Sequence, residues 1–183
     1  MKKNIAILAL ALSSSVFAGD SATVEYQNLN TNGSADQKNL GLTVKHEFST
    51  KVTGDLGISS TVTEGTGALS TRMEAGSTYT IPVAIGVSGY VRCAMGQKFT
   101  NTSDFTYYSV EPGVSAPVGP VTVKAGLRYR SSTNPAINND QTHTARLGVS
   151  YAVSKQDTVG VRYDRVRGDA VQNVLAVNYT RNF

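Results

Sequence analysis

The chain has few of the residues that build covalently linked or metal-held sites. Cys93 is its only cysteine, so no internal disulfide can form. Two separated histidines and one cysteine provide no ligand spacing for a metal. Beyond the N-terminus, no segment approaches the roughly 20 apolar residues that a membrane-spanning helix needs. Basic residues are spread singly and form no patch with exposed aromatics. The sequence therefore predicts no metal, no cofactor and no nucleic-acid partner.

The N-terminus has the parts of a secretory signal peptide. Two lysines follow the first methionine, an apolar stretch runs over residues 5–12, and small residues up to Ala18 form a cleavage site. The apolar stretch is too short to stay in a bilayer as a spanning helix. We therefore expect a signal peptide at residues 1–18 and one mature domain at residues 19–183. Loss of the two lysines lowers the formal charge from +4 to +2, because 15 basic residues then face 13 acidic ones.

Short segments that alternate apolar and polar residues fill the rest of the chain. Clusters of Gly, Asn, Asp, Ser, Thr and Pro separate them, and no helical period competes. We predict ten strands, at residues 22–29, 38–48, 52–62, 69–81, 83–93, 104–115, 121–131, 142–153, 157–166 and 171–183. An even number suits an up-and-down barrel whose two chain ends lie on one side. The tight link at Pro82 is the weakest turn, and merging the segments there leads, after one further reassignment, to eight strands.

The links between these segments alternate in length. Short links are expected at residues 49–51, at Pro82, and at residues 116–120 and 154–156. Longer or more polar links are expected at residues 30–37, 63–68, 94–103, 132–141 and 167–170. Short periplasmic turns and longer external loops are typical of outer-membrane barrels. None of the external loops is long enough for a folded plug domain.

The alternation gives each predicted strand two unlike faces. In the second segment, Leu40, Leu42 and Val44 share one face, while Thr43 and Lys45 share the other. The seventh and eighth segments repeat this division. Alternation alone fits two architectures, a barrel in lipid with an apolar outside and a soluble β-sandwich such as a secreted adhesin domain.

The aromatic residues favour the barrel. On an up-and-down path they fall near strand ends at two levels, with Tyr26, Tyr129 and Tyr163 at the outer level and Phe48, Tyr79, Tyr151 and Phe183 at the inner level. Aromatic girdles at both membrane interfaces are typical of transmembrane barrels, whereas a sandwich core has no reason to sort its rings in this way. We therefore predict an all-β fold, a closed antiparallel up-and-down transmembrane β-barrel with ten strands.

The polar face of the strands then lines the barrel interior. Eight bases and six acids are expected there: Glu25, Lys45, Glu47, Asp55, Arg72, Glu74, Arg92, Glu111, Lys124, Arg128, Arg130, Arg146, Arg162 and Asp164. On the lipid face, an Arg or Lys near the bilayer midplane costs about 2 to 4 kcal/mol. Small residues are expected to share the interior and to leave room for water: Gly41, Gly57, Ser59, Gly86, Ser88, Gly126, Gly148, Ser150 and Gly160.

The last strand carries an assembly signal. Leu175, Val177 and Tyr179 share one face, and the chain ends on Phe183. This ending resembles the C-terminal signal by which Gram-negative outer-membrane barrels are recognised, although Arg181 stands where that signal usually has a hydrophobic residue. With the signal peptide, the alternation and the aromatic belts, the mature chain resembles the small outer-membrane β-barrel proteins of the porin-like or opacity type. The resemblance implies an outer-membrane location, contact with outer-membrane lipid, and the barrel assembly machinery as a partner during biogenesis.

Two functions remain open at this point. One is a narrow porin-like channel for small solutes or ions, with a weakly basic lumen and a weak anion preference. The other is a closed structural or adhesive barrel whose external loops bind a partner. Side chains just fill an eight-stranded barrel, and ten strands are only slightly wider, so a wide aqueous pore is not expected.

Catalysis has little support in the sequence. Only His143 falls near the external rim, where barrel enzymes place their catalytic groups, and Asp140 is close to it in the chain. No Ser-His-Asp set is apparent. His46 is predicted to turn toward the lower membrane interface. We expect no catalytic residues.

Overall fold

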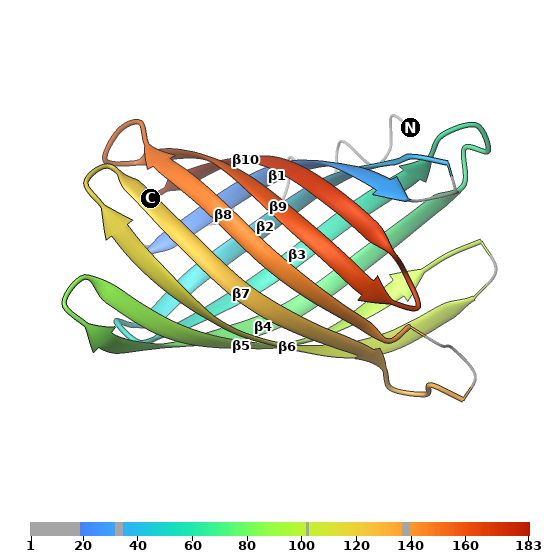
Figure 1. Cartoon of the computed structure of the whole chain (residues 1–183), viewed down its shortest axis with the longest axis horizontal. Helices are drawn as coiled ribbons and strands as arrows, with labels where there is room; N and C mark the ends of the chain where they lie inside the picture. The colour runs from blue at the N-terminus through green and yellow to red at the C-terminus, as the bar shows by residue number, and fades with distance from the viewer. Residues whose placement is uncertain (1–18, 32–34, 102, 137–139) are drawn as a thin grey trace.

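The computed structural model describes residues 19–31, 35–101, 103–136 and 140–183, which form ten strands (Figure 1). The predicted signal peptide and its cleavage site after Ala18 lie outside the described residues. No helix in the described part of the chain is long and apolar enough to cross a membrane. The strands are β1 Asp20–Thr31, β2 Gln37–Ser49, β3 Val52–Thr63, β4 Leu69–Ala84, β5 Val87–Phe99, β6 Asp104–Val118, β7 Val121–Ser132, β8 Thr142–Ala152, β9 Asp157–Gly168 and β10 Gln172–Asn182.

The ten strands form one closed antiparallel barrel. Each strand pairs with its neighbours in the sequence, and β1 pairs with β10 to close the sheet. This confirms the predicted fold and strand number, and it excludes both the eight-stranded barrel and the sandwich. Closure pairs the backbone N–H and C=O groups of every strand on both sides, which is what a sheet needs in a medium without water.

The strands tilt strongly against the barrel axis (Figure 1). A row of paired residues that starts at Ser21, one residue into β1, passes Lys45 and Asp55 on the next two strands. Followed further around the sheet, the same row reaches Gly168 at the far end of β9. Because of this stagger, two side chains that meet inside the barrel can lie at different positions counted from the start of their own strands.

The two ends of the barrel differ. The start of β1 and the C-terminal Phe183 lie at one end of the barrel, where Phe183 N donates to the carbonyl oxygen of Asp20 at 2.9 Å. At that end, which we call the turn end, the links are short: residues 50–51, 85–86, 119–120 and 153–156. At the opposite end, the loop end, the links are residues 32–36, 64–68, 100–103, 133–141 and 169–171. The loop-end links 32–36, 64–68 and 133–141 are longer than every turn-end link, whereas 100–103 and 169–171 are not longer than 153–156, so the predicted alternation is present only in part.

The predicted turn at Pro82 is wrong. Pro82 lies within β4, opposite Ser88, and the register shifts between Pro82 and Ala84. The chain reverses at Ile85 and Gly86, where Gly86 has φ +73°, a conformation that glycine adopts at no steric cost. Gly86 is thus a turn residue, whereas the sequence predicts it on the inward face. A proline is tolerated at such an irregularity because its missing N–H leaves no paired acceptor unsatisfied.

The predicted link at residues 94–103 is also wrong, because β5 continues to Phe99. The composition around Gly96 is typical of a loop, but this glycine has a packing role within the strand. A Cβ at Gly96 would lie 2.6 Å from the carbonyl oxygen of Met73 and 2.5 Å from Cζ of Tyr107. The missing side chain therefore makes room for the Tyr107 ring inside the barrel, and the link shrinks to residues 100–103.

The apolar face of the sheet points outward. Leu56 is 68% exposed and Leu127 is 66% exposed, as expected for side chains that face lipid and not a packed core. Few hydrophobic residues are buried among the described ones: Leu42, Ala94, Tyr107, Val174 and Ala176. The buried polar and charged residues are more numerous. This fold is consequently inverted relative to a water-soluble protein, with a polar core inside an apolar surface.

Candidate functional site in the barrel interior

Four side chains form a compact ion-pair group on the inward face, which we call the Glu74 cluster (Asp55, Glu74, Arg92 and Arg128). The Glu74 carboxylate accepts from Arg92 at 2.7 Å and from Arg128 at 2.5 Å. Arg92 also donates through Nε to Asp55 at 3.0 Å. The hydroxyl of Tyr107 completes the site by donating to Glu74 at 2.9 Å. Because Glu74 is on β4 and Arg128 is on β7, their contact runs through the interior of the barrel.

A second group, the Arg146 chain, joins Glu111, Arg146, Asp164, Arg162 and Glu25 in that order. Arg146 donates to Glu111 at 2.6 Å, and its Nε lies 3.5 Å from Asp164. Arg162 lies 3.0 Å from Asp164 and 2.7 Å from Glu25. These residues come from β6, β8, β9 and β1. Two of the ion pairs, Glu111–Arg146 and Arg162–Glu25, connect strands that are not adjacent in the sheet.

These interior ion pairs are well shielded from solvent. The Glu74 side chain is 14% exposed and that of Arg128 is 10% exposed. By contrast, the ion pair between Lys38 and Glu64 near the loop end has side chains that are 54% and 48% exposed. Arginine suits the interior pairs because its planar fork can bind more than one carboxylate at once. In both interior groups, each carboxylate is therefore paired with at least one arginine.

Several interior bases make no ion pair within the described residues. Lys45 and Lys124 are exposed on the inward face toward the turn end, and Arg72 lies near the loop end. Lys98, near the end of β5, belongs with them and is missing from the sequence prediction. The sequence predicts a link at residues 94–103, so it places no inward side chain there. The alternation Arg92, Ala94, Gly96, Lys98 would have found this lysine if the strand had been extended.

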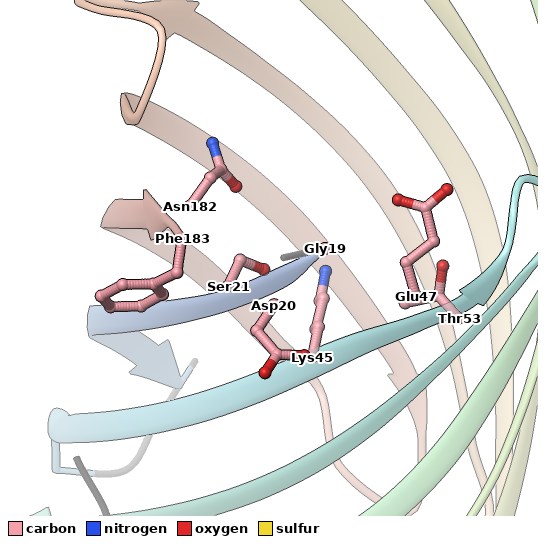
Figure 2. A pocket seen from close by; sticks show the side chains of 8 residues that line it. All are labelled: Gly19, Asp20, Ser21, Lys45, Glu47, Thr53, Asn182 and Phe183. Atoms are coloured by element: carbon pink, nitrogen blue, oxygen red, sulfur yellow. The ribbon is translucent and has the colours of Figure 1, made fainter. Parts of the chain in front are cut away.

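A cavity of about 320 Å³ opens at the turn end (Figure 2). Lys45, Glu47 and Thr53 line it from β2 and β3. Ser21 of β1, Asn182 of β10 and the C-terminal Phe183 also line it, and Figure 2 shows their side chains. Glu47 makes no ion pair among the described residues, so its carboxylate and the Lys45 ammonium both remain available to solvent in this vestibule.

The two candidate catalytic residues near the external rim are not brought together. Asp140 is buried and accepts from Arg130 at 2.7 Å. His143 is exposed and lies against the ring of Tyr129, with centroids 5.2 Å apart. His46 is on the outward face, where its Nδ1 is 2.5 Å from Asp20. No group of His, Cys, Asp and Glu that could hold a metal occurs in the part of the chain that the structure describes.

The predicted interface aromatics lie on the outward face, and Phe48, the most exposed, has 68% of its surface accessible. In the final strand, Leu175, Val177, Tyr179 and Phe183 are also exposed. Arg181 pairs with Asp157 at 3.2 Å outside the barrel. Contact of the aromatics with the membrane interface and recognition of the last strand during assembly remain predictions.

A closed up-and-down barrel with an exposed apolar outside and an ion-paired inside belongs to the class of outer-membrane β-barrels. The model of the Gram-negative porin family matches residues 8–171. The chain therefore belongs to the Gram-negative porin family and is a porin-like barrel of the outer membrane.

Solved outer-membrane proteins share the fold at low sequence identity. An outer-membrane channel from Pseudomonas putida F1 is 10% identical with a TM-score of 0.59, over 92% of this chain and 97% of that one. The KdgM porin, solved in complex with disordered oligogalacturonate, is 13% identical with a TM-score of 0.51, over 88% and 99%. The translocator domain of the autotransporter NalP from Neisseria meningitidis is 11% identical with a TM-score of 0.53, over 100% and 94%. No curated protein sequence matches the chain.

Proposed function

We propose that this porin is a narrow channel for small solutes and ions with a weak preference for anions. The observation that carries the proposal is the excess of basic over acidic side chains that make no ion pair inside the barrel. Among the described residues, four interior bases make no ion pair: Lys45, Lys124, Arg72 and Lys98. Of the predicted interior acids that the structure describes, only Glu47 makes none. Unpaired bases raise the local concentration of anions in a narrow, low-dielectric passage.

The position of the bases supports the same conclusion. Lys45 and Lys124 are exposed on the inward face near the turn end, and Lys45 lines the vestibule of about 320 Å³ there. Arg72 and Lys98 stand near the loop end. An anion crossing the barrel therefore meets an unpaired base at each end, while the two ion-paired groups narrow the passage between them.

Conductance in planar bilayers tests the channel. Purified, folded protein is expected to produce small steps, and the reversal potential in a KCl gradient is expected to show Cl⁻ favoured over K⁺. The double variant Lys45→Gln, Lys124→Gln should reduce this preference, whereas Lys155→Gln in an exposed turn should leave it unchanged. Absence of steps from protein that shows heat-modifiable migration on SDS gels would overturn the channel, and a preference for K⁺ would overturn the anion selectivity.

A closed structural or adhesive barrel is the second candidate, and the shielding of the interior favours it. Asp55 and Asp164 are 8% and 4% exposed, so the wall carries little water at these positions. Such a barrel would bind its partner through the loop end, which whole-cell binding to host matrix would detect.

We propose no catalytic role, because Asp140 and His143 point to different sides of the sheet. Outer-membrane lipid and the assembly machinery complete the proposed partners.

A further inference from the structure

Three bases lie close together near the loop end, two of them against the ring of Tyr107, and we call them the outer basic cluster (Arg72, Lys98 and Arg130). The Tyr107 ring is fully buried, with Cζ of Arg72 5.7 Å and Cζ of Arg130 5.5 Å from its centroid. Lys98 is paired in register with Arg72 on the neighbouring strand. It lies within Coulombic range of both arginines. The fold thus collects three positive charges in one region of the interior.

This arrangement is unfavourable without a counter-charge. Like charges directly opposite each other on neighbouring strands destabilise a sheet, and shielded charges need a partner. Arg72 makes no ion pair within the described residues, and its Nε is shielded from solvent without a hydrogen-bond partner. The carboxylate of Glu74 cannot serve it fully, because it already accepts from Arg92, Arg128 and Tyr107.

One carboxylate does reach the cluster. Asp140 accepts from Arg130 at 2.7 Å, but its Oδ2 is buried and has no hydrogen-bond partner among the described residues. Three bases therefore face a single carboxylate that uses one of its oxygens. Of the three bases, only Arg130 donates to this carboxylate among the described residues.

We propose that the outer basic cluster is a binding site for a small polyvalent anion that carries phosphate or carboxylate groups. The guanidinium forks of Arg72 and Arg130 match the oxygen geometry of these groups, and the Lys98 ammonium adds a third donor. Tyr107 holds both guanidinium groups against its ring before the anion arrives. Asp140 competes with the anion for Arg130. The site rests on the proposed function in that the solute enters the lumen from the loop end, but binding does not require conduction.

Calorimetric titration of the folded protein in non-ionic detergent with inorganic phosphate tests the site. The wild-type protein is expected to show saturable binding of one phosphate. Arg72→Gln and Lys98→Gln should each weaken the affinity by about tenfold or more, because each removes a charge-assisted contact. Asp140→Asn should strengthen binding, because it removes the competing charge. Lys155→Gln in an exposed turn is the matched control and should bind phosphate as the wild type does.

A second measurement separates binding from a structural role. If the cluster serves an anion, Arg72→Gln relieves a repulsion between like charges. Without phosphate, the variant should therefore need a higher temperature than the wild type before its migration on SDS gels changes. Phosphate should raise this temperature further in the wild type, and less in the variant. Equal phosphate affinity in the wild type and in both cluster variants would overturn the site. So would loss of binding only in the Lys45→Gln, Lys124→Gln variant. Binding by a protein that forms no conducting steps would refute the channel and leave the anion site standing.

Discussion

Replacement of Glu74 by glutamine tests whether interior ion pairs stabilise this barrel. The substitution keeps the shape of the side chain and removes its charge. Arg92 retains a carboxylate partner, because Asp55 accepts from it at 3.0 Å. Arg128 loses its only ion-pair partner among the described residues and keeps the hydroxyl of Ser109 at 3.1 Å.

The expected loss follows from this difference between the two arginines. Removing one partner of a buried ion pair costs about 3 to 5 kcal/mol, because it leaves an uncompensated charge out of water. Only one of the two arginines is left uncompensated, so we expect the lower end, about 3 kcal/mol of the free energy of unfolding. This corresponds to roughly two powers of ten in the folding equilibrium constant.

Urea unfolding in lipid vesicles, followed by far-ultraviolet circular dichroism, measures this loss. Glu64→Gln is the matched control, because it also removes the carboxylate of an ion pair, here with Lys38, at side chains that are 48% and 54% exposed. The control should change stability by about 0 to 1 kcal/mol. Equal losses in the two variants would refute the reasoning, because they would place the Glu74 cluster in a solvent-like dielectric.

Further predictions concern packing, lipid contact and export. Gly96→Ala should cost about 1 to 3 kcal/mol by urea unfolding, because its Cβ would meet backbone, whereas Gly148→Ala, with its nearest atom at 3.7 Å, should change little. Leu127→Arg places a charge on the lipid face and should cost about 2 to 4 kcal/mol in vesicles, against about 0 to 1 for Val153→Arg in the turn between β8 and β9. N-terminal sequencing of protein from the outer membrane should find cleavage after Ala18, and an uncleaved N-terminus would contradict the predicted signal peptide.

Much of the barrel could be predicted from local patterns. The side-chain period of a strand is two, so Leu40, Leu42 and Val44 identify a lipid face wherever strand type is established. Arginines on the opposite parity, such as Arg128 and Arg146, must then lie inside, because the bilayer cannot solvate them. These inferences need only neighbouring residues.

Turns and strand ends were harder to predict, because loop-like composition can have a packing cause. Gly96 is a glycine because Tyr107 occupies the space above it, and Tyr107 is on the next strand. Pro82 could remain in β4 because the register shifts beside it. Neither cause is visible in a window of the sequence. Both errors propagated, because the misplaced turn put Gly86 on the inward face and the shortened fifth strand hid Lys98.

Alternation along the chain predicts for most strand residues whether the side chain points outward or inward, with Gly86 and Lys98 as exceptions, and it predicts an even up-and-down set of strands. Those properties depend on the alternation of side chains and on the mismatch between charge and hydrocarbon. Which charges pair with one another depends on the closed barrel and cannot be read from the sequence pattern. The tilt of the strands brings Glu74 to Arg128 and Arg162 to Glu25 across the interior, while Arg72 and Lys98 remain without a carboxylate of their own among the described residues. Pairing depends on the stagger of a closed sheet, which no single strand specifies.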